Sequence, residues 1–144
     1  MFELDPRLVS DTVPLGDFPL CRVLLMNDSR YPWLILVPRV SLVREVFNLT
    51  AEQQQQLWRE TSAVGLVLKD FYQADKINIA TLGNVVSQLH MHVVVRMKHD
   101  EAWPAPVWGS GNVQPYSSDE LATVRGRLHE ALSEMWLTGA EAAL

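Results

Sequence analysis

Cysteine is almost absent from the sequence, and so are the marks of an exported protein. Cys21 is the single cysteine among 144 residues, so neither an internal disulfide nor a cysteine-based zinc site can form. Residues 1–5 carry two acidic side chains where a signal peptide would be basic and then apolar. Both observations favour a reducing compartment, and we expect a cytoplasmic protein.

Long apolar runs and an excess of positive charge are also missing. The most apolar segment, Trp33–Val37, is bounded by prolines and is far shorter than the roughly 20 residues that span a bilayer. Twelve basic and seventeen acidic residues give a net charge of −5, so the chain has no general attraction for nucleic acid or for an anionic membrane. We therefore expect a soluble protein with neither of these partners.

The composition that remains is typical of a globular domain. The chain is 48% hydrophobic and 20% charged, and its 144 residues are close to the size of one ordinary domain. No stretch resembles a linker, and no internal repeat is present. We expect one domain over residues 1–144.

Hydrophobic periodicity predicts strands and helices that alternate loosely along the chain. The expected strands are residues 20–26, 33–37, 76–81 and 87–96. The expected helices are residues 50–72 and 118–136, the first introduced by a capping-box pattern at Thr50 and Gln53. Prolines and glycines predict irregular segments at residues 1–19, with room for one short helical turn, and at residues 99–116. Locally paired strands with helices against them indicate an α+β fold on a mostly antiparallel sheet.

The strand at residues 87–96 carries the side chains best suited to chemistry. Gln88, His90 and His92 alternate with apolar residues, so a strand presents all three on one face. A strand otherwise built from Leu, Met and Val rarely gives one face to polar groups, because buried polar groups need partners. This face is predicted to line a cleft or to bind a ligand.

The residue types alone leave three interpretations of the histidine pair open. The row could be a solvated sheet face without a function. The two imidazoles could ligate a metal ion, for which His99 and Asp100 are the nearest candidates for a third ligand. One imidazole could instead attack phosphorus, since a neutral imidazole needs no prior deprotonation.

The segment Gln88-Leu-His90-Met-His92-Val-Val-Val-Arg96 resembles the signature of the histidine triad (HIT) family, in which three histidines alternate with apolar residues along a strand. The first two strands, the long helix and the Gly83-Asn84 turn are also similar to that family. The resemblance covers roughly residues 18–108 and leaves an arm and a helix at 109–144. It implies a HIT-like α+β fold with an antiparallel sheet of about five strands, one long helix and a C-terminal helix. It also implies a homodimer with a continuous sheet.

The resemblance assigns roles by position. His90 occupies the position of the family's nucleophile, which would form a nucleotidyl-histidine intermediate at the α-phosphate, and His92 would bind phosphate oxygens or the leaving group. Asn27 would bind ribose, Asn84 would contact phosphate, and Leu25 would help to wall the base pocket. The implied activity is that of a nucleotide hydrolase or nucleotidyl transferase, with dinucleoside polyphosphates among the substrates and with no metal or other cofactor.

The first triad position departs from the family's pattern because it holds Gln88. Glutamine makes hydrogen bonds but cannot carry a proton between about pH 5 and 8. Acid assistance to a poor leaving group is therefore in doubt, whereas phosphate-like leaving groups need less of it. A nucleotide-binding protein with weak turnover and a metal enzyme with histidine ligands stay open as alternatives. The composition of the segment Trp103–Trp108 is typical of a packed arm, whereas the resemblance implies that it helps to shape the pocket.

Overall fold

A central antiparallel hairpin organises the sheet in the computed structural model, which describes residues 1–137. The hairpin joins β2 (Cys21–Met26) to β3 (Trp33–Pro38). With β1 (Thr12–Asp17), β5 (Met91–Arg96) and β4 (Lys76–Ala80), it forms a five-stranded sheet in the order β1-β2-β3-β5-β4. All neighbouring strands are antiparallel, so the predicted α+β class is confirmed.

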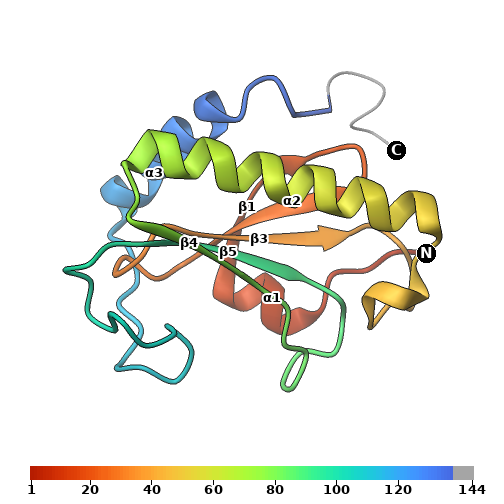
Figure 1. The fold of residues 1–144 in the computed structure, drawn as a ribbon, viewed down its shortest axis with the longest axis horizontal. Helices are drawn as coiled ribbons and strands as arrows, with labels where there is room; N and C mark the ends of the chain where they lie inside the picture. Colours follow the sequence, from red (N-terminus) through yellow and green to blue (C-terminus); the bar gives the residue numbers. More distant parts are fainter. Residues whose placement is uncertain (138–144) are drawn as a thin grey trace.

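The long helix α2 (Ala51–Tyr72) runs along one face of the sheet (Figure 1). It begins as predicted, because the Thr50 side chain accepts a hydrogen bond from the Gln53 backbone N–H and the Gln53 side chain accepts one from the Thr50 N–H. Its contacts are with β5 and β4. Within residues 1–137, no helix is both long enough and apolar enough to cross a membrane.

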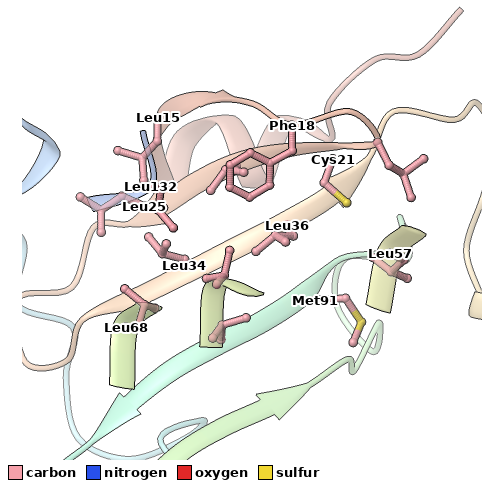
Figure 2. Packing of buried hydrophobic residues seen from close by; sticks show 14 of the residues in the cluster. Leu15, Phe18, Cys21, Leu25, Leu34, Leu36, Leu57, Leu68, Met91 and Leu132 are labelled. Carbon is pink, nitrogen blue, oxygen red and sulfur yellow. The ribbon is translucent and has the colours of Figure 1, made fainter. Parts of the chain in front are cut away.

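Two apolar clusters pack on the two faces of the sheet. The helix-side core lies between the sheet and α2, and Figure 2 shows Leu25, Leu34 and Met91 of the strands near Leu57 and Leu68 of α2. The second cluster, here called the opposite-face cluster, contains alternate residues of the same strands. Its buried members are Leu8, Leu24, Tyr31, Trp33, Ile35, Val37, Val94, Ala102 and Val107. The period-two alternation of the strands explains why one sequence supplies both clusters.

The N-terminal region is more regular than predicted. Residues 6–11 form the short helix α1 (Pro6–Asp11), as the predicted short helical turn allowed, and β1 follows it directly where the sequence predicted irregular chain. The sequence did not predict this strand because Pro14 and Gly16 are unfavourable inside a strand. The structure accommodates both because β1 is an edge strand whose register shifts between them, as in a β-bulge.

Two other element boundaries differ from the prediction. Strand β5 begins at Met91 instead of residue 87, so Gln88 and His90 precede it. The last helix, α3 (Ser118–Ala131), ends before the predicted residue 136. There the chain turns and Trp136 packs back against Phe18, with 4.7 Å between ring centroids. A single 3-10 turn, η1 (Val46–Asn48), precedes α2.

A buried carboxylate connects α2 to the start of β2. Glu60 is 3% exposed and accepts hydrogen bonds at 2.9 Å from the backbone N–H groups of Leu20 and Cys21. Its Oε2 accepts a further bond from the Gln56 side chain. Burial raises the pKa of the Cys21 thiol far above its ordinary value, and the neighbouring Glu60 carboxylate raises it further. Glu60 therefore sets the position of β2 relative to the helix.

Replacing Glu60 by alanine should reduce the free energy of unfolding by about 3 kcal/mol, because two buried backbone N–H groups lose their charged acceptor. Urea unfolding followed by circular dichroism measures this difference. The exposed Glu130→Ala variant is the matched control and should change the value by less than about 0.5 kcal/mol. Equal unfolding midpoints for the two variants would contradict this role of Glu60.

Candidate active site

Two buried imidazoles lie side by side at the N-terminal end of β5. His92 pairs with Ile35 of β3 on one side and with Ala80 of β4 on the other, and His90 immediately precedes the strand. The rings have centroids 4.8 Å apart, and each residue is only 5% exposed. Because Met91 and Val93 belong to the helix-side core, the two histidines face the side of the sheet away from α2.

The hydrogen bond of His90 fixes which ring nitrogen holds the proton. His90 Nδ1 lies 2.7 Å from the backbone carbonyl oxygen of Gln88. A carbonyl oxygen only accepts hydrogen bonds, so in the neutral ring Nδ1 holds the proton and Nε2 carries the lone pair. The Gln88 backbone oxygen therefore selects the tautomer of neutral His90.

His92 has the opposite tautomer. Its Nδ1 accepts a hydrogen bond at 3.0 Å from the indole Nε1–H of Trp33, so its proton is on Nε2. Burial lowers the pKa of His92 to about 3, and the neighbouring His90 lowers it as well. His92 is thus a neutral donor at physiological pH. Because an unfolded histidine binds a proton near pH 6.5, this group lowers folding stability as the pH falls from about 6.5 towards 3.

Tryptophans form the wall beside His92. The Trp33 and Trp108 rings have centroids 5.7 Å and 5.2 Å from the His92 ring, and the two indoles are 5.8 Å apart. Trp108 comes from the segment for which the sequence left two roles open, that of a packed arm and that of a part of the pocket. Its indole N–H is buried, and no acceptor for it is present among residues 1–137. No sequence pattern distinguished these two indoles from ordinary core tryptophans.

An ion pair holds the loop that brings Trp108 to the site. Arg96, at the end of β5, is 2% exposed and donates two hydrogen bonds to the Asp100 carboxylate and one to the Asn78 side chain. Asp100 also accepts from the Trp103 backbone N–H at 2.8 Å. Burial by itself would raise the pKa of Asp100, but the hydrogen bonds, led by that of Arg96, hold it below its usual range. The Arg30 side chain also holds this loop, because it donates a hydrogen bond at 2.7 Å to the Ser110 backbone carbonyl.

Gln88 lies next to the histidines in sequence but directs its side chain to the N-terminus. Its Oε1 accepts a hydrogen bond from the backbone N–H of Asp5 at 2.9 Å, and its Nε2 donates to the backbone carbonyl of Glu3 at 2.8 Å. Both ends of the amide are therefore occupied by main-chain groups of residues 3–5. The predicted row of three polar side chains along one strand is reduced to the two imidazoles.

Comparison with known proteins agrees with this arrangement. The family model described as the HIT domain matches residues 7–99, about two-thirds of the chain. The chain belongs to the HIT domain family.

Solved structures of bacterial histidine triad proteins resemble this HIT chain over nearly its full length. One from Marinobacter aquaeolei VT8 is 48% identical, with a TM-score of 0.91, and covers 94% of this chain and 98% of its own. One from Sinorhizobium meliloti 1021 is also 48% identical, with a TM-score of 0.89 and coverage of 92% and 98%. The Arabidopsis thaliana protein named bifunctional bis(5'-adenosyl)-triphosphatase/adenylylsulfatase FHIT is 27% identical over 72% of this chain. The chain spans 61% of the length of that relative.

The structure does not bring all the residues expected from the HIT resemblance to the histidines. Leu25 is fully buried in the helix-side core, where Figure 2 shows it. Leu24 belongs to the opposite-face cluster and pairs with Ile35, the partner of His92. Strand alternation thus gives the face of the imidazoles to Leu24, and the role of Leu25 beside a base stays a prediction.

The two asparagines lie at turns. Asn27 follows β2, and its side-chain oxygen accepts a hydrogen bond from the Tyr116 backbone N–H at 2.9 Å. Asn84 is exposed in the turn after β4, where Gly83 has a φ of +77° that a side chain would strain. Neither asparagine contacts an imidazole through a hydrogen bond in the described part of the chain.

A metal centre would need a third ligand near the two histidines. Within residues 1–137, no three His, Cys, Asp or Glu side chains gather closely enough to hold an ion. Of the two ligand candidates taken from the sequence, Asp100 is bonded to Arg96 and His99 is exposed.

Replacing Trp33 by phenylalanine should release the Nδ1 atom of His92, because the indole N–H is its only hydrogen-bond donor among the described residues. We expect ¹⁵N NMR of the unmodified protein to show a neutral His92 protonated on Nε2 from pH 5 to 8, and the variant to show a mixture of tautomers. Trp58→Phe, at an exposed position of α2, is the control. An unchanged His92 spectrum in Trp33→Phe would show that the indole does not select the tautomer.

Proposed function

We propose that this HIT protein cleaves nucleotide derivatives at the α-phosphate through a nucleotidyl-histidine intermediate. The observation that carries the proposal is the pair of opposite tautomers: His90 presents a lone pair on Nε2 and the adjacent His92 presents an N–H on Nε2. A nucleophile beside a neutral donor suits attack on a phosphoryl group whose oxygens gain negative charge.

In the first step, Nε2 of His90 attacks the α-phosphorus. A phosphorus–nitrogen bond forms while the bond from phosphorus to the leaving-group oxygen breaks, and that oxygen keeps the electron pair. Water then attacks the same phosphorus, nitrogen leaves, and a nucleoside monophosphate is released with the imidazole restored. His92 donates its Nε2–H to a phosphoryl oxygen in both steps and remains neutral, in agreement with its low pKa.

The substrates favoured by this site have weakly basic leaving groups. Neither a protonated His92 nor an ionisable residue at position 88 is available near neutral pH to protonate a departing alkoxide or amine. Polyphosphate and sulfate groups depart as stable anions and need little protonation. The activities named for the Arabidopsis relative, on bis(5'-adenosyl) triphosphate and on adenylylsulfate, involve leaving groups of this kind and support the choice of test substrates.

The remaining contacts with the nucleotide belong to the same proposal. Asn27 has its side-chain oxygen occupied by Tyr116, which leaves its amide N–H groups to bind ribose. Asn84 contacts phosphate from its exposed turn. The buried Trp108 indole N–H gains an acceptor when a phosphoryl or sulfuryl oxygen enters beside His92, which removes the cost of an unpaired donor.

A nucleotide-binding protein with little turnover is the second candidate, and one observation favours it. His90 and His92 are each only 5% exposed, and five cavities formed by residues 1–137 are lined by other residues. The two candidates differ in whether a covalent nucleotidyl-His90 forms.

Changing His90 to alanine should abolish release of AMP from diadenosine triphosphate and from adenylylsulfate, while the dissociation constant for AMP changes by less than about tenfold, since chemistry and binding use different groups. When the reaction is stopped without acid, mass spectrometry should detect the adenylyl adduct on His90 of the unmodified enzyme.

The His92→Ala variant should lower kcat by about 10²–10³, and the variant at the exposed His99, His99→Ala, should keep full activity. AMP binding without any adduct or release would favour the second candidate.

We also propose that two copies of this chain pair through β4. Strand β4 is the outer strand next to β5, so the main-chain groups of its free edge face outward. Exposed apolar side chains are present on β4 and on the helix α2 that packs against it, namely Ile79 at 38%, Phe71 at 43% and Leu66 at 73% exposure. A two-fold pairing of these edges would make one continuous sheet and cover the apolar groups.

Sedimentation equilibrium should give twice the chain mass of 16.3 kDa. Ile79→Lys places a charge at the free edge and should shift the protein to monomers, whereas Val113→Lys, at an exposed site on the loop before α3, should not. A monomeric unmodified protein at 50–100 µM, about the concentration at which weak homodimers assemble, would contradict the pairing.

A further inference from the structure

His90 and His92 are each 5% exposed in this structure, and the N-terminal arm, defined here as residues 1–5, packs on their side of the sheet. Phe2 and Leu4 pack against the opposite-face cluster, to which Trp33 and Ile35 beside His92 belong. Figure 1 shows the arm passing from the end of the sheet to α1. An attacking Nε2 must reach phosphorus within bonding distance, so a residue that is 5% exposed needs its cover to move before a nucleotide can enter.

Few polar contacts hold this arm in place. Asp5 is bonded to the start of α1, where its side chain accepts from the Arg7 N–H and its carbonyl oxygen accepts from the Val9 N–H. Beyond α1, the hydrogen bonds that join residues 1–5 to the described chain are the two made by the Gln88 amide. A cavity of about 400 Å³ lies between the arm and residues 41–44, so packing on that side is incomplete.

The Gln88 amide is suited to these two hydrogen bonds, and a side chain without both a donor and an acceptor cannot make them. It accepts from the Asp5 N–H and donates to the Glu3 carbonyl from one planar group, which requires one acceptor and one donor side by side. A carboxylate would place an acceptor against the Glu3 carbonyl. At the same time the Gln88 backbone oxygen accepts the Nδ1–H of His90. One residue thus joins the arm to the nucleophile.

We infer that Gln88 is a positioning residue that fastens the N-terminal arm over His90 and His92, so that release of its two hydrogen bonds opens the site to nucleotide. The role of the arm in admitting nucleotide rests on the proposed function. The attachment of the arm by Gln88 does not depend on that function. It gives residue 88 a role other than proton transfer to the leaving group.

The first experiment measures the fastening without any substrate. In Gln88→Met, which keeps the length of the side chain but removes both bonds, the Asp5 amide should exchange with deuterium about thirtyfold faster by NMR. Diethyl pyrocarbonate, which acylates neutral imidazole, should modify His90 faster by a similar factor, while the exposed His99 reacts equally in all variants as an internal standard. Gln55→Met, at an exposed position of α2, is the matched control and should behave as the unmodified protein.

A deletion provides a second route in case Gln88→Met folds poorly. Removing residues 2–4 while keeping Asp5 as the cap of α1 should raise His90 reactivity to the level of Gln88→Met. Combining the deletion with Gln88→Met should give no further increase, because both changes act on the same cover. Unchanged His90 reactivity in the single variant and in the deletion would overturn the inference.

The competing role, leaving-group protonation, is tested with Gln88→His. Fastening predicts that this change alters single-turnover rates for acidic and basic leaving groups by the same factor. Selective acceleration of the basic leaving groups, with an additional titration near pH 6.5, would overturn the inference in favour of an acid at position 88. Faster exchange and acylation in a protein that hydrolyses no nucleotide would instead uphold the fastening and reject the proposed function.

Discussion

The hydrogen bond from the Trp33 indole to His92 is the interaction on which the site depends. It exists because β3 and β5 pair in a register that places Trp33 opposite Val94 and Ile35 opposite His92. A one-residue slip would send the indole into the helix-side core and leave Nδ1 of His92 without a donor. The tautomer of a side chain in β5 is thus a consequence of strand pairing, and the pairing is in turn secured by two apolar clusters on opposite faces.

The polar groups around the sheet each have a defined partner, and together they keep the imidazoles in place. Arg96 and Asp100 orient the loop that brings Trp108 to His92, and Glu60 fixes the start of β2 from the other face. Such buried ion pairs and carboxylates are costly to desolvate and therefore tolerate little change in geometry. The N-terminal arm, by comparison, is joined to the segment before β5 by the two hydrogen bonds of the neutral Gln88 amide.

The sequence predicted the elements with strong periodicity and missed those whose signal depends on tertiary contacts. The alternation around His92 and the capping box at Thr50 were sufficient for β5 and α2. β1 was missed because Pro14 and Gly16 weaken a strand pattern, and only its edge position with a bulge makes both acceptable. The role of Leu25 came from the resemblance alone, because β2 is apolar on both faces and its sequence does not show that Leu24, and not Leu25, shares the face of the imidazoles.

For the site itself, sequence identified the two imidazoles but not their tautomers. The Gln88 backbone oxygen and the Trp33 indole determine these, and both act through hydrogen bonds that no spacing pattern encodes. The same holds for the Gln88 side chain, whose partners are backbone atoms more than eighty residues away in the chain.

The environment of Cys21 has a practical consequence for work on this molecule. The thiol is buried at the base of β2 and its pKa is raised by burial and by Glu60, so at neutral pH it stays protonated and inaccessible to alkylating reagents. A cysteine introduced at any exposed position is therefore the one reactive thiol in the chain. Fluorescent or spin labels attached near the N-terminus would report the motion of that segment in the native sequence background, with no need to remove the natural cysteine first.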